Sequence, residues 1–197
     1  MTTLGKWAAL CCCLWGLSAS LYAESTSVVQ GNFSQPIPAQ GDGCAWMDPV
    51  TLDVPYHWQI VDIDVHLTIT HSDIRDLAIM LDCPWGQTVI LKDTWQIHLG
   101  DSALVNMYDT IFDDAAAAEL MAGVAPYSAA FVPAEPLTAC NNRDAHGLWR
   151  LRIYDAYYAD TGTLDNWQLH ITHVPEPVSL LYLLCGLARL IYRRGYQ

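Results

Sequence analysis

The chain is poor in basic residues, and this shortage excludes whole classes of partner. Among 197 residues only nine are Lys or Arg, against 21 Asp or Glu. Within 24–173 twenty acidic residues face five basic ones, a net charge near −15 with neutral histidines. Such a surface repels phosphate backbones and anionic head groups, so we do not expect nucleic acid as a partner. It suits divalent cations or cationic partners, and it equally fits a surface that is merely solvated.

The sequence also lacks the short motifs that mark common active sites. It contains no Gly-x-Ser-x-Gly elbow, no His-Glu-x-x-His and no Cys-x-x-Cys. His66 and His170 alternate with apolar residues, which favours solvent-facing or cross-strand positions over a ligand role. We therefore expect a protein that is not an enzyme, and a hydrolase of unrecognised type is the alternative.

Long helical patterns are missing as well, and only 113–123 has room for one helical turn. Apolar residues instead alternate with polar ones in three runs, at 62–70, 149–154 and 167–172. Two short apolar runs, at 77–81 and 89–91, are also predicted to be strands. Eight Trp and ten Tyr favour an aromatic-packed β interior. These features predict an all-β fold, a jelly-roll-like antiparallel β-sandwich. The runs at 149–154 and 167–172, joined by a Gly-containing loop, are expected to pair with each other.

The boundaries of the sandwich are predicted from turn residues and from the composition of the two ends. Gly and Pro residues predict an irregular lead-in over 24–44, of which 24–36 precede the sandwich at 37–173. Residues 1–23 combine Lys6, an apolar run and a stretch of small residues, the layout of a secretory signal peptide. Cleavage is expected after Ala23 or near Ser20.

The segment 174–197 is predicted to hold the exported chain at a membrane. Its apolar run, 178–192, is interrupted by Arg189 and is shorter than the ~20 residues of a spanning helix. The Arg189 stem can reach the interface, and the basic pair at the end favours a cytoplasmic terminus. The alternative is a last strand or helix of the core.

Three cysteines remain between the two ends, an odd number for an exported protein. They are Cys44, Cys83 and Cys140. In an oxidising compartment, we expect these three cysteines to form one disulfide and leave one free thiol. The sequence leaves open which two of the three would pair.

Six pieces of the chain carry a family pattern in their order and spacing. They are Val65–His71, Arg75–Leu81, Pro84–Thr88, Phe112–Ala115, Pro133–Leu137, and the pair formed by Gly147–Asp155 and Gly162–Leu169. Together they resemble the P domain, also called P/Homo B, of proprotein convertases and bacterial subtilisin-like proteases. That resemblance implies a jelly-roll sandwich that stabilises a protease domain, although 24–44 is too short to hold one. Cys83 departs from the pattern, which usually has a small polar residue there.

The C-terminal segment resembles a second family pattern, the PEP-CTERM sorting signal of Gram-negative bacteria. The carrying residues are Pro175, Glu176, Pro177, Arg193 and Arg194, around the apolar run. This resemblance implies export through the inner membrane, transient anchoring, and processing by an exosortase-type enzyme. The product would then reside in the envelope or outside the cell, in an exopolysaccharide setting.

Acidic residues near the predicted strand ends are candidate calcium ligands. Calcium prefers six to eight oxygens and tolerates irregular loops, and clustered carboxylates repel one another unless a cation compensates them. The P-domain resemblance also implies occasional stabilisation by calcium. The candidate ligands are Asp76, Asp113, Asp114, Asp155 and Asp160, with Asp155 and Asp160 preferred. The alternative is that these acids cap turns and solvate loops.

Two non-enzymatic functions follow. The first is a noncatalytic, envelope-anchored P domain that binds a protein partner or supports a matrix, with Tyr157 and Tyr158 in its contact surface. The second is a carbohydrate-binding module of an exopolysaccharide matrix, for which Tyr157, Tyr158, Trp85 and Trp95 are candidate platforms. Trp149 and Trp167 are instead expected in the core.

Overall fold

The computed structural model describes residues 24–38, 41, 44–94 and 104–174, and Thr26–His173 form one compact unit within them. The predicted signal peptide, Trp95 and the sorting residues Pro175, Glu176, Pro177, Arg193 and Arg194 lie outside the described residues. The strands are β1 (Ser25–Ile37), β2 (Ala45–Trp46), β3 (Val50–Val54), β4 (Gln59–His71), β5 (Leu77–Asp82), β6 (Thr88–Lys92), β7 (Met107–Phe112), β8 (Ala130–Phe131), β9 (Gly147–Asp155) and β10 (Gly162–Val174). Three short 3-10 helices accompany them, η1 (Ile74–Asp76), η2 (Leu120–Ala122) and η3 (Leu137–Cys140).

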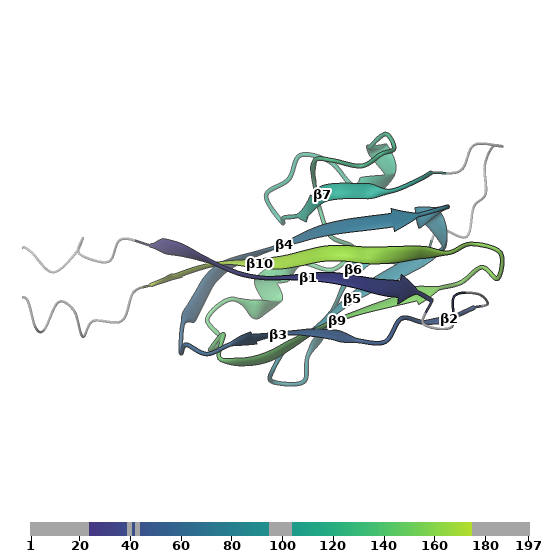
Figure 1. Ribbon diagram of the computed structural model, residues 1–197. Coiled ribbons are helices and arrows are strands. Elements are labelled where there is room, and N and C mark those ends of the chain that lie inside the picture. The colour runs from purple at the N-terminus through teal and green to yellow at the C-terminus, as the bar shows by residue number, and fades with distance from the viewer. Residues whose placement is uncertain (1–23, 39–40, 42–43, 95–103, 175–197) are drawn as a thin grey trace, which may run out of the picture. The chain divides into compact units, whose positions relative to one another are not determined.

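The strands form two sheets, which confirms the predicted sandwich. The first sheet has the order β1-β10-β4-β7-β8, and the second has the order β2-β9-β5-β6 with β3 also on β9. Figure 1 shows β1, β10 and β4 side by side in one layer, with β5 and β9 in the other. Pairing is antiparallel between β9 and its partners and between β4 and β7, whereas the short contact of β7 with β8 is parallel.

The predicted alternation places one face of each strand in a shared core. Along β4, residues from Ile63 to Ile69 alternate between buried and half-buried. Each sheet contributes one completely buried tryptophan, Trp149 from β9 and Trp167 from β10, as predicted. The Trp149 indole Nε1 donates a hydrogen bond to the Ala145 carbonyl at 2.8 Å, so its polar atom is satisfied inside the core.

Histidines on the outer face of the first sheet form the expected cross-strand contact. His66 on β4 and His170 on β10 stack with ring centroids 3.6 Å apart and planes 8° apart. Burial, followed by the neighbouring His66, lowers the pKa of His170. This pair therefore belongs to the packing of two neighbouring strands.

The prediction of an irregular lead-in over 24–44 is wrong for most of that segment, because β1 occupies Ser25–Ile37. It lies at the edge of the first sheet beside β10, where Asn166 Nδ2 donates to the Gly31 carbonyl at 2.9 Å. Its side chains Val29 and Phe33 pack against the core. An edge strand needs hydrogen bonds on one side only, so Pro36 is compatible with it.

The predicted pairing of the last two strands is also wrong. β9 lies between β5 and the β2 and β3 strands, whereas β10 lies between β1 and β4 in the other sheet. The loop 156–161 therefore crosses from one sheet to the other instead of closing a hairpin. Each strand finds its partners far away in the sequence, as in a jelly roll.

Among the described residues, helical structure is as scarce as the sequence predicts. The single turn expected within 113–123 is η2, at Leu120–Ala122. In the part of the chain that the structure describes, no helix is long and apolar enough to cross a membrane.

Candidate functional site at the loops that follow β4 and β9

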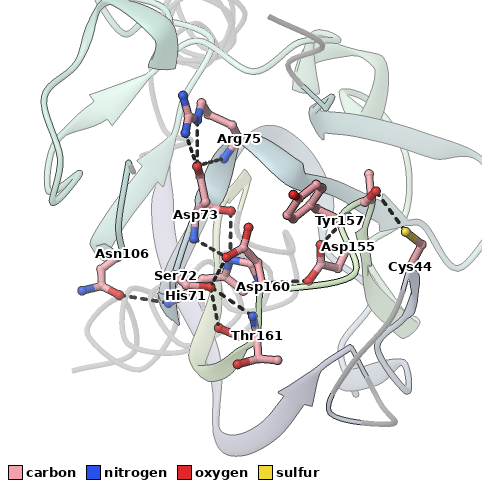
Figure 2. A network of polar contacts seen from close by, with 11 residues as sticks. Cys44, His71, Ser72, Asp73, Arg75, Asn106, Asp155, Tyr157, Asp160 and Thr161 are labelled. Carbon is pink, nitrogen blue, oxygen red and sulfur yellow. Dashed lines mark hydrogen bonds and ion pairs between the residues drawn. The ribbon is translucent and has the colours of Figure 1, made fainter. Parts of the chain in front are cut away.

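Two loops meet at one end of the sandwich. β4 ends at His71 and is followed by η1, while β9 ends at Asp155 and is followed by the crossing loop 156–161. The register of β5 against β9 pairs Leu77 with Asp155, and the Ala156 amide donates to the Asp76 carbonyl at 3.0 Å. Figure 2 shows the polar side chains that gather there.

His71 is the buried centre of this network. Its Nε2 lies 3.2 Å from Asp155 Oδ2, and both side chains are fully buried. Its Nδ1 lies 2.9 Å from the Asp73 carbonyl and 3.2 Å from the Asp73 amide. Because the Asp155 carboxylate only accepts, the Nε2 of His71 is the donor in this hydrogen bond. Both ring nitrogens are therefore occupied by the protein itself.

Asp155 links the two loops through hydrogen bonds. One of its carboxylate oxygens accepts from His71, and the other accepts from the Tyr157 amide at 3.0 Å. Asn106 fastens His71 from a third segment, since its Oδ1 accepts from the His71 amide at 2.9 Å. The start of the crossing loop is held by groups that are out of contact with water.

Ser72 and Asp160 form a second hydrogen-bonded link between the two loops, nearer the surface. The Ser72 hydroxyl donates to Asp160 Oδ1 at 2.7 Å and accepts from the Thr161 amide at 3.0 Å. The Ser72 amide donates to the Thr161 carbonyl at 3.2 Å. Ser72 therefore bonds to a carboxylate and to backbone, so its hydroxyl is not activated by an imidazole.

Asp73 and Arg75 form a nearly buried ion pair. Asp73 caps η1 by accepting from the Arg75 amide at 3.0 Å. The Arg75 Nε donates to both Asp73 oxygens at 2.9 Å, and its terminal nitrogen adds a further contact. Burial alone would raise the pKa of Asp73, but the hydrogen bonds from Arg75 outweigh it, so the pKa is lowered.

Lys92 brings a second cation to the same region, at the end of β6. The residue is only 3% exposed, and its Nζ donates to the carbonyls of Leu77, Asp93 and Arg75 at 2.5, 3.0 and 3.3 Å. Burial lowers the pKa of Lys92 to about 7, against the opposing attraction of Asp76, Asp93 and Asp73. The carboxylates at this end thus have basic neighbours of their own.

The structure divides the predicted calcium ligands between different places. It brings Asp76 and Asp160 together with Asp73, with one oxygen of each within 4.8 Å of the other two. Asp155 lies nearby, but its oxygens are bound to His71 and Tyr157. The trio supplies the hard oxygen atoms that calcium prefers, although Arg75 already neutralises Asp73.

Asp113 and Asp114 do not join this group, so the expected gathering of all five acids is corrected. They follow Phe112, which pairs with Val65, whereas the other end of β7 pairs Met107 with Ile69, close to His71. Asp113 Oδ1 accepts from the Ala115 amide at 2.6 Å. The Asp114 oxygens accept from the amides of Leu137 and Thr138 at 2.9 and 2.7 Å. These two acids hold loops, as the alternative interpretation expected.

The crossing loop exposes the two predicted contact residues. Tyr157 is 40% exposed and Tyr158 is 67% exposed, with ring centroids 5.0 Å apart. Beside the loop, the Cys44 thiol donates to the Ala156 carbonyl at 3.1 Å. The tyrosines therefore belong to a loop whose start is bonded to His71 and Asp76 and whose end is bonded to Ser72.

A shallow groove near this loop contains an aromatic residue that sequence reasoning missed. Trp46 is 42% exposed, its ring lies 5.1 Å from that of Tyr154, and the Arg152 guanidinium lies 5.1 Å from its centroid. The groove is lined by Cys44, Ala45, Trp46, Met47, Asp48, Pro49, Arg152 and Tyr154. Trp85, a predicted platform, instead packs edge-on against the buried Trp149.

Comparison with known proteins gives one family match. Residues 60–171 match the family profile described as proprotein convertase P-domain. No curated protein matches the chain. Two similar solved structures are the serine protease of Aeromonas sobria (15% identity, TM-score 0.46, covering 81% of this chain) and FlhE (9%, 0.38, 78%). The alignment covers 29% of the protease and 99% of FlhE.

Proposed function

The chain belongs to the proprotein convertase P-domain family, and from this we propose that it is a noncatalytic, exported P domain that acts by binding or by structural support in the bacterial envelope. The family match over 60–171 is the observation that carries the proposal. Absence of the common catalytic motifs from the sequence supports it. So does the geometry of Ser72 and His71, because neither side chain activates the other.

The contact surface in this proposal is the crossing loop with Tyr157 and Tyr158. The hydrogen bonds from His71 to Asp155 and from Ser72 to Asp160 hold both ends of the loop, so little conformational entropy remains to be lost on binding. The tyrosines supply amphipathic contact area. The acidic surface of the chain favours a cationic envelope protein as the partner.

The binding proposal is tested with the full-length chain and an isolated envelope fraction. Replacing both tyrosines, Y157A/Y158A, is expected to weaken saturable binding at least tenfold, the scale of lost hot-spot residues. Leu148→Ala is the matched control, because Leu148 is 59% exposed at the opposite end of β9. Equal binding by the double variant and the wild type would reject the loop as the contact surface.

We further propose that calcium binds the trio of Asp73, Asp76 and Asp160. Bound calcium would compensate the mutual repulsion of these carboxylates. Thermal melting of the full chain in EGTA and then in excess calcium tests this, with an expected rise in Tm of about 5 °C or more. Asp160→Asn should abolish the rise, whereas Asp53→Asn, on the exposed face of β3, should keep it. A wild-type Tm that calcium leaves unchanged eliminates the site.

Sorting at the C-terminus is the remaining part of the proposal. We expect export through the inner membrane of a Gram-negative cell, transient anchoring by 174–197, and processing at Pro175–Pro177 by an exosortase-type enzyme. Cells with and without such an enzyme should differ in the size and location of the chain. Replacing all three motif residues with alanine should abolish the difference, and processing that is indifferent to this change would refute the sorting route.

A carbohydrate-binding module is the second candidate, and the exposed Trp46 beside Tyr154 favours it. Flat aromatic faces with a neighbouring guanidinium are suited to sugar rings and their hydroxyl groups. A glycan array separates the candidates, since absence of binding to every polysaccharide removes this one. A binding signal that Trp46→Ala abolishes and Y157A/Y158A leaves intact would favour it over a protein partner.

A further inference from the structure

Two buried cysteines that are distant in the sequence meet inside the sandwich. Cys83 follows β5 at the start of the turn to β6, and Cys140 is the last residue of η3. They are 4% and 0% exposed, and their sulfur atoms lie 3.6 Å apart. Cys44 is exposed, and its thiol faces the Ala156 carbonyl instead.

The backbone around each cysteine is held independently of the other. On one side, the Cys83 amide donates to the Gln87 carbonyl at 2.7 Å, and the Gly86 amide donates to the Cys83 carbonyl at 2.9 Å. On the other side, Asp114 accepts hydrogen bonds from the backbone amides of Leu137 and Thr138, and these bonds fix the start of η3. The proximity of the sulfurs therefore follows from two well-bonded turns.

We propose that Cys83 and Cys140 form an intramolecular disulfide, with Cys44 remaining a thiol. A disulfide requires a sulfur separation of ~2.05 Å, so the pair closes once two protons and two electrons are removed. A dialkyl disulfide such as oxidised glutathione is the oxidant. One cysteine thiolate attacks it and releases one glutathione thiolate, and the second cysteine thiolate then displaces the other. The products are one protein disulfide and two molecules of reduced glutathione.

The bond would fasten the β5–β6 turn to η3, segments separated by 57 positions in the chain. Closing a loop of this length removes conformational freedom chiefly from the unfolded chain. Because both sulfurs are buried, exchange takes place while the chain folds or while these turns open transiently. The proposal does not depend on the function proposed above.

Tryptic peptide mapping tests the pairing directly on the wild-type chain. The full-length chain is refolded with mixed oxidised and reduced glutathione, its free thiols are alkylated, and it is cleaved. Cys83 lies in peptide 76–92 and Cys140 in peptide 93–143, while Cys44 lies in 7–75 or its signal-free remainder. The expected product joins 76–92 to 93–143, with Cys44 alkylated. Alkylation of both Cys83 and Cys140, or a link from either to the Cys44 peptide, overturns the proposal.

Cysteine variants provide the matched comparison. Cys44→Ser should keep the link between 76–92 and 93–143, and its Tm should rise on the order of 10 °C on oxidation. Cys83→Ser and Cys140→Ser should show neither effect. If either of these two fails to fold, the wild-type map still decides the pairing. A Cys44→Ser chain whose oxidation leaves the Tm unchanged and produces no linked peptide contradicts the proposal.

Discussion

At the scale of single residues, the ammonium group of Lys92 couples the stability of the sandwich to pH. Its pKa is near 7 in the folded protein, whereas an unfolded lysine titrates near 10.5. Between these values the unfolded chain holds a proton that the folded chain has lost, so stability rises with pH across this window. The slope is at most about 1.4 kcal/mol per pH unit.

Lys92→Met is therefore expected to flatten the pH dependence of unfolding. From pH 7.5 to 9 the wild type should gain about 2 kcal/mol relative to this variant, measured by chemical denaturation at each pH. Arg150→Met, an exposed cation on β9, is the control and should retain the wild-type slope. Parallel curves for wild type and Lys92→Met would show that Lys92 does not titrate in this range.

Asp64 imposes the opposite dependence at lower pH. Burial, followed by the charges of Asp113, Asp62 and Asp114, raises its pKa to about 6. Between about 3.8 and 6 the folded chain holds the extra proton, so this group lowers stability as pH rises. Asp64→Asn should remove that fall, measured as unfolding midpoints from pH 4 to 7, and should melt above the wild type at pH 7. A wild-type pH profile that the variant reproduces would contradict the assignment.

The residue scale also shows what local pattern could identify at the candidate site. Asp76 and Asp160 could be selected because acids beside strand ends are plausible ligands. Lys92 could not, because alternation from Val89 and Leu91 would point it outward. A bulge pairs Ile79 with Lys92 but Met80 with Ile90, so two successive residues of β6 are buried. Such a register change depends on the partner strand.

At the scale of elements, the entry of β10 into the first sheet depends on Gly162. A Cβ atom there would lie 2.1 Å from the Thr70 carbonyl oxygen and 2.8 Å from the His71 Cα, both backbone atoms of β4. The crossing loop can return to the first sheet at this close distance only without a side chain. Gly162 therefore helps to set the position of the crossing loop 156–161, called the tyrosine loop below because it carries Tyr157 and Tyr158.

Gly162→Ala is expected to destabilise the protein by ~3 kcal/mol, because backbone cannot move aside as a side chain can. Gly86→Ala is the comparison, since open space surrounds Gly86 and only its φ of +88° opposes a side chain. Its expected cost is ~1 kcal/mol. Denaturant unfolding of both variants measures the difference, and equal losses would contradict the close approach of β10 to β4.

Strands with clean alternation were predictable, whereas their partners were not. The alternating runs at 62–70 and 149–154 correspond to β4 and β9, whose burial has a period of two. The apolar run at 77–81 corresponds to β5, which is buried on both faces at its start. β1 is hard to predict because Gly31 and Pro36 indicate breaks in regular structure, although an edge strand accepts both. The pairing of β9 with β10 failed because adjacency in sequence does not determine which sheet a strand joins.

At the scale of the whole molecule, the core residues and the residues of the candidate site lie in different parts of the sandwich. Apolar side chains from both sheets form one core, so the polar residues of the candidate site lie in loops at an end of the strands. The proposed disulfide would join two turns of the sandwich, and the hydrogen bonds of His71 and Ser72 hold the crossing loop 156–161. This division is compatible with the proposed function, because binding at an exposed loop requires no catalytic centre.

Site-specific photo-crosslinking in an exopolysaccharide-producing Gram-negative cell tests the central claim that the tyrosine loop is the contact surface. A photoreactive residue would replace Tyr158, 67% exposed beyond the end of β9, or Leu148, 59% exposed near its start. The account predicts a larger crosslinked species from position 158 alone. Equal crosslinking from both positions, crosslinking from 148 alone, or none from 158 would contradict it.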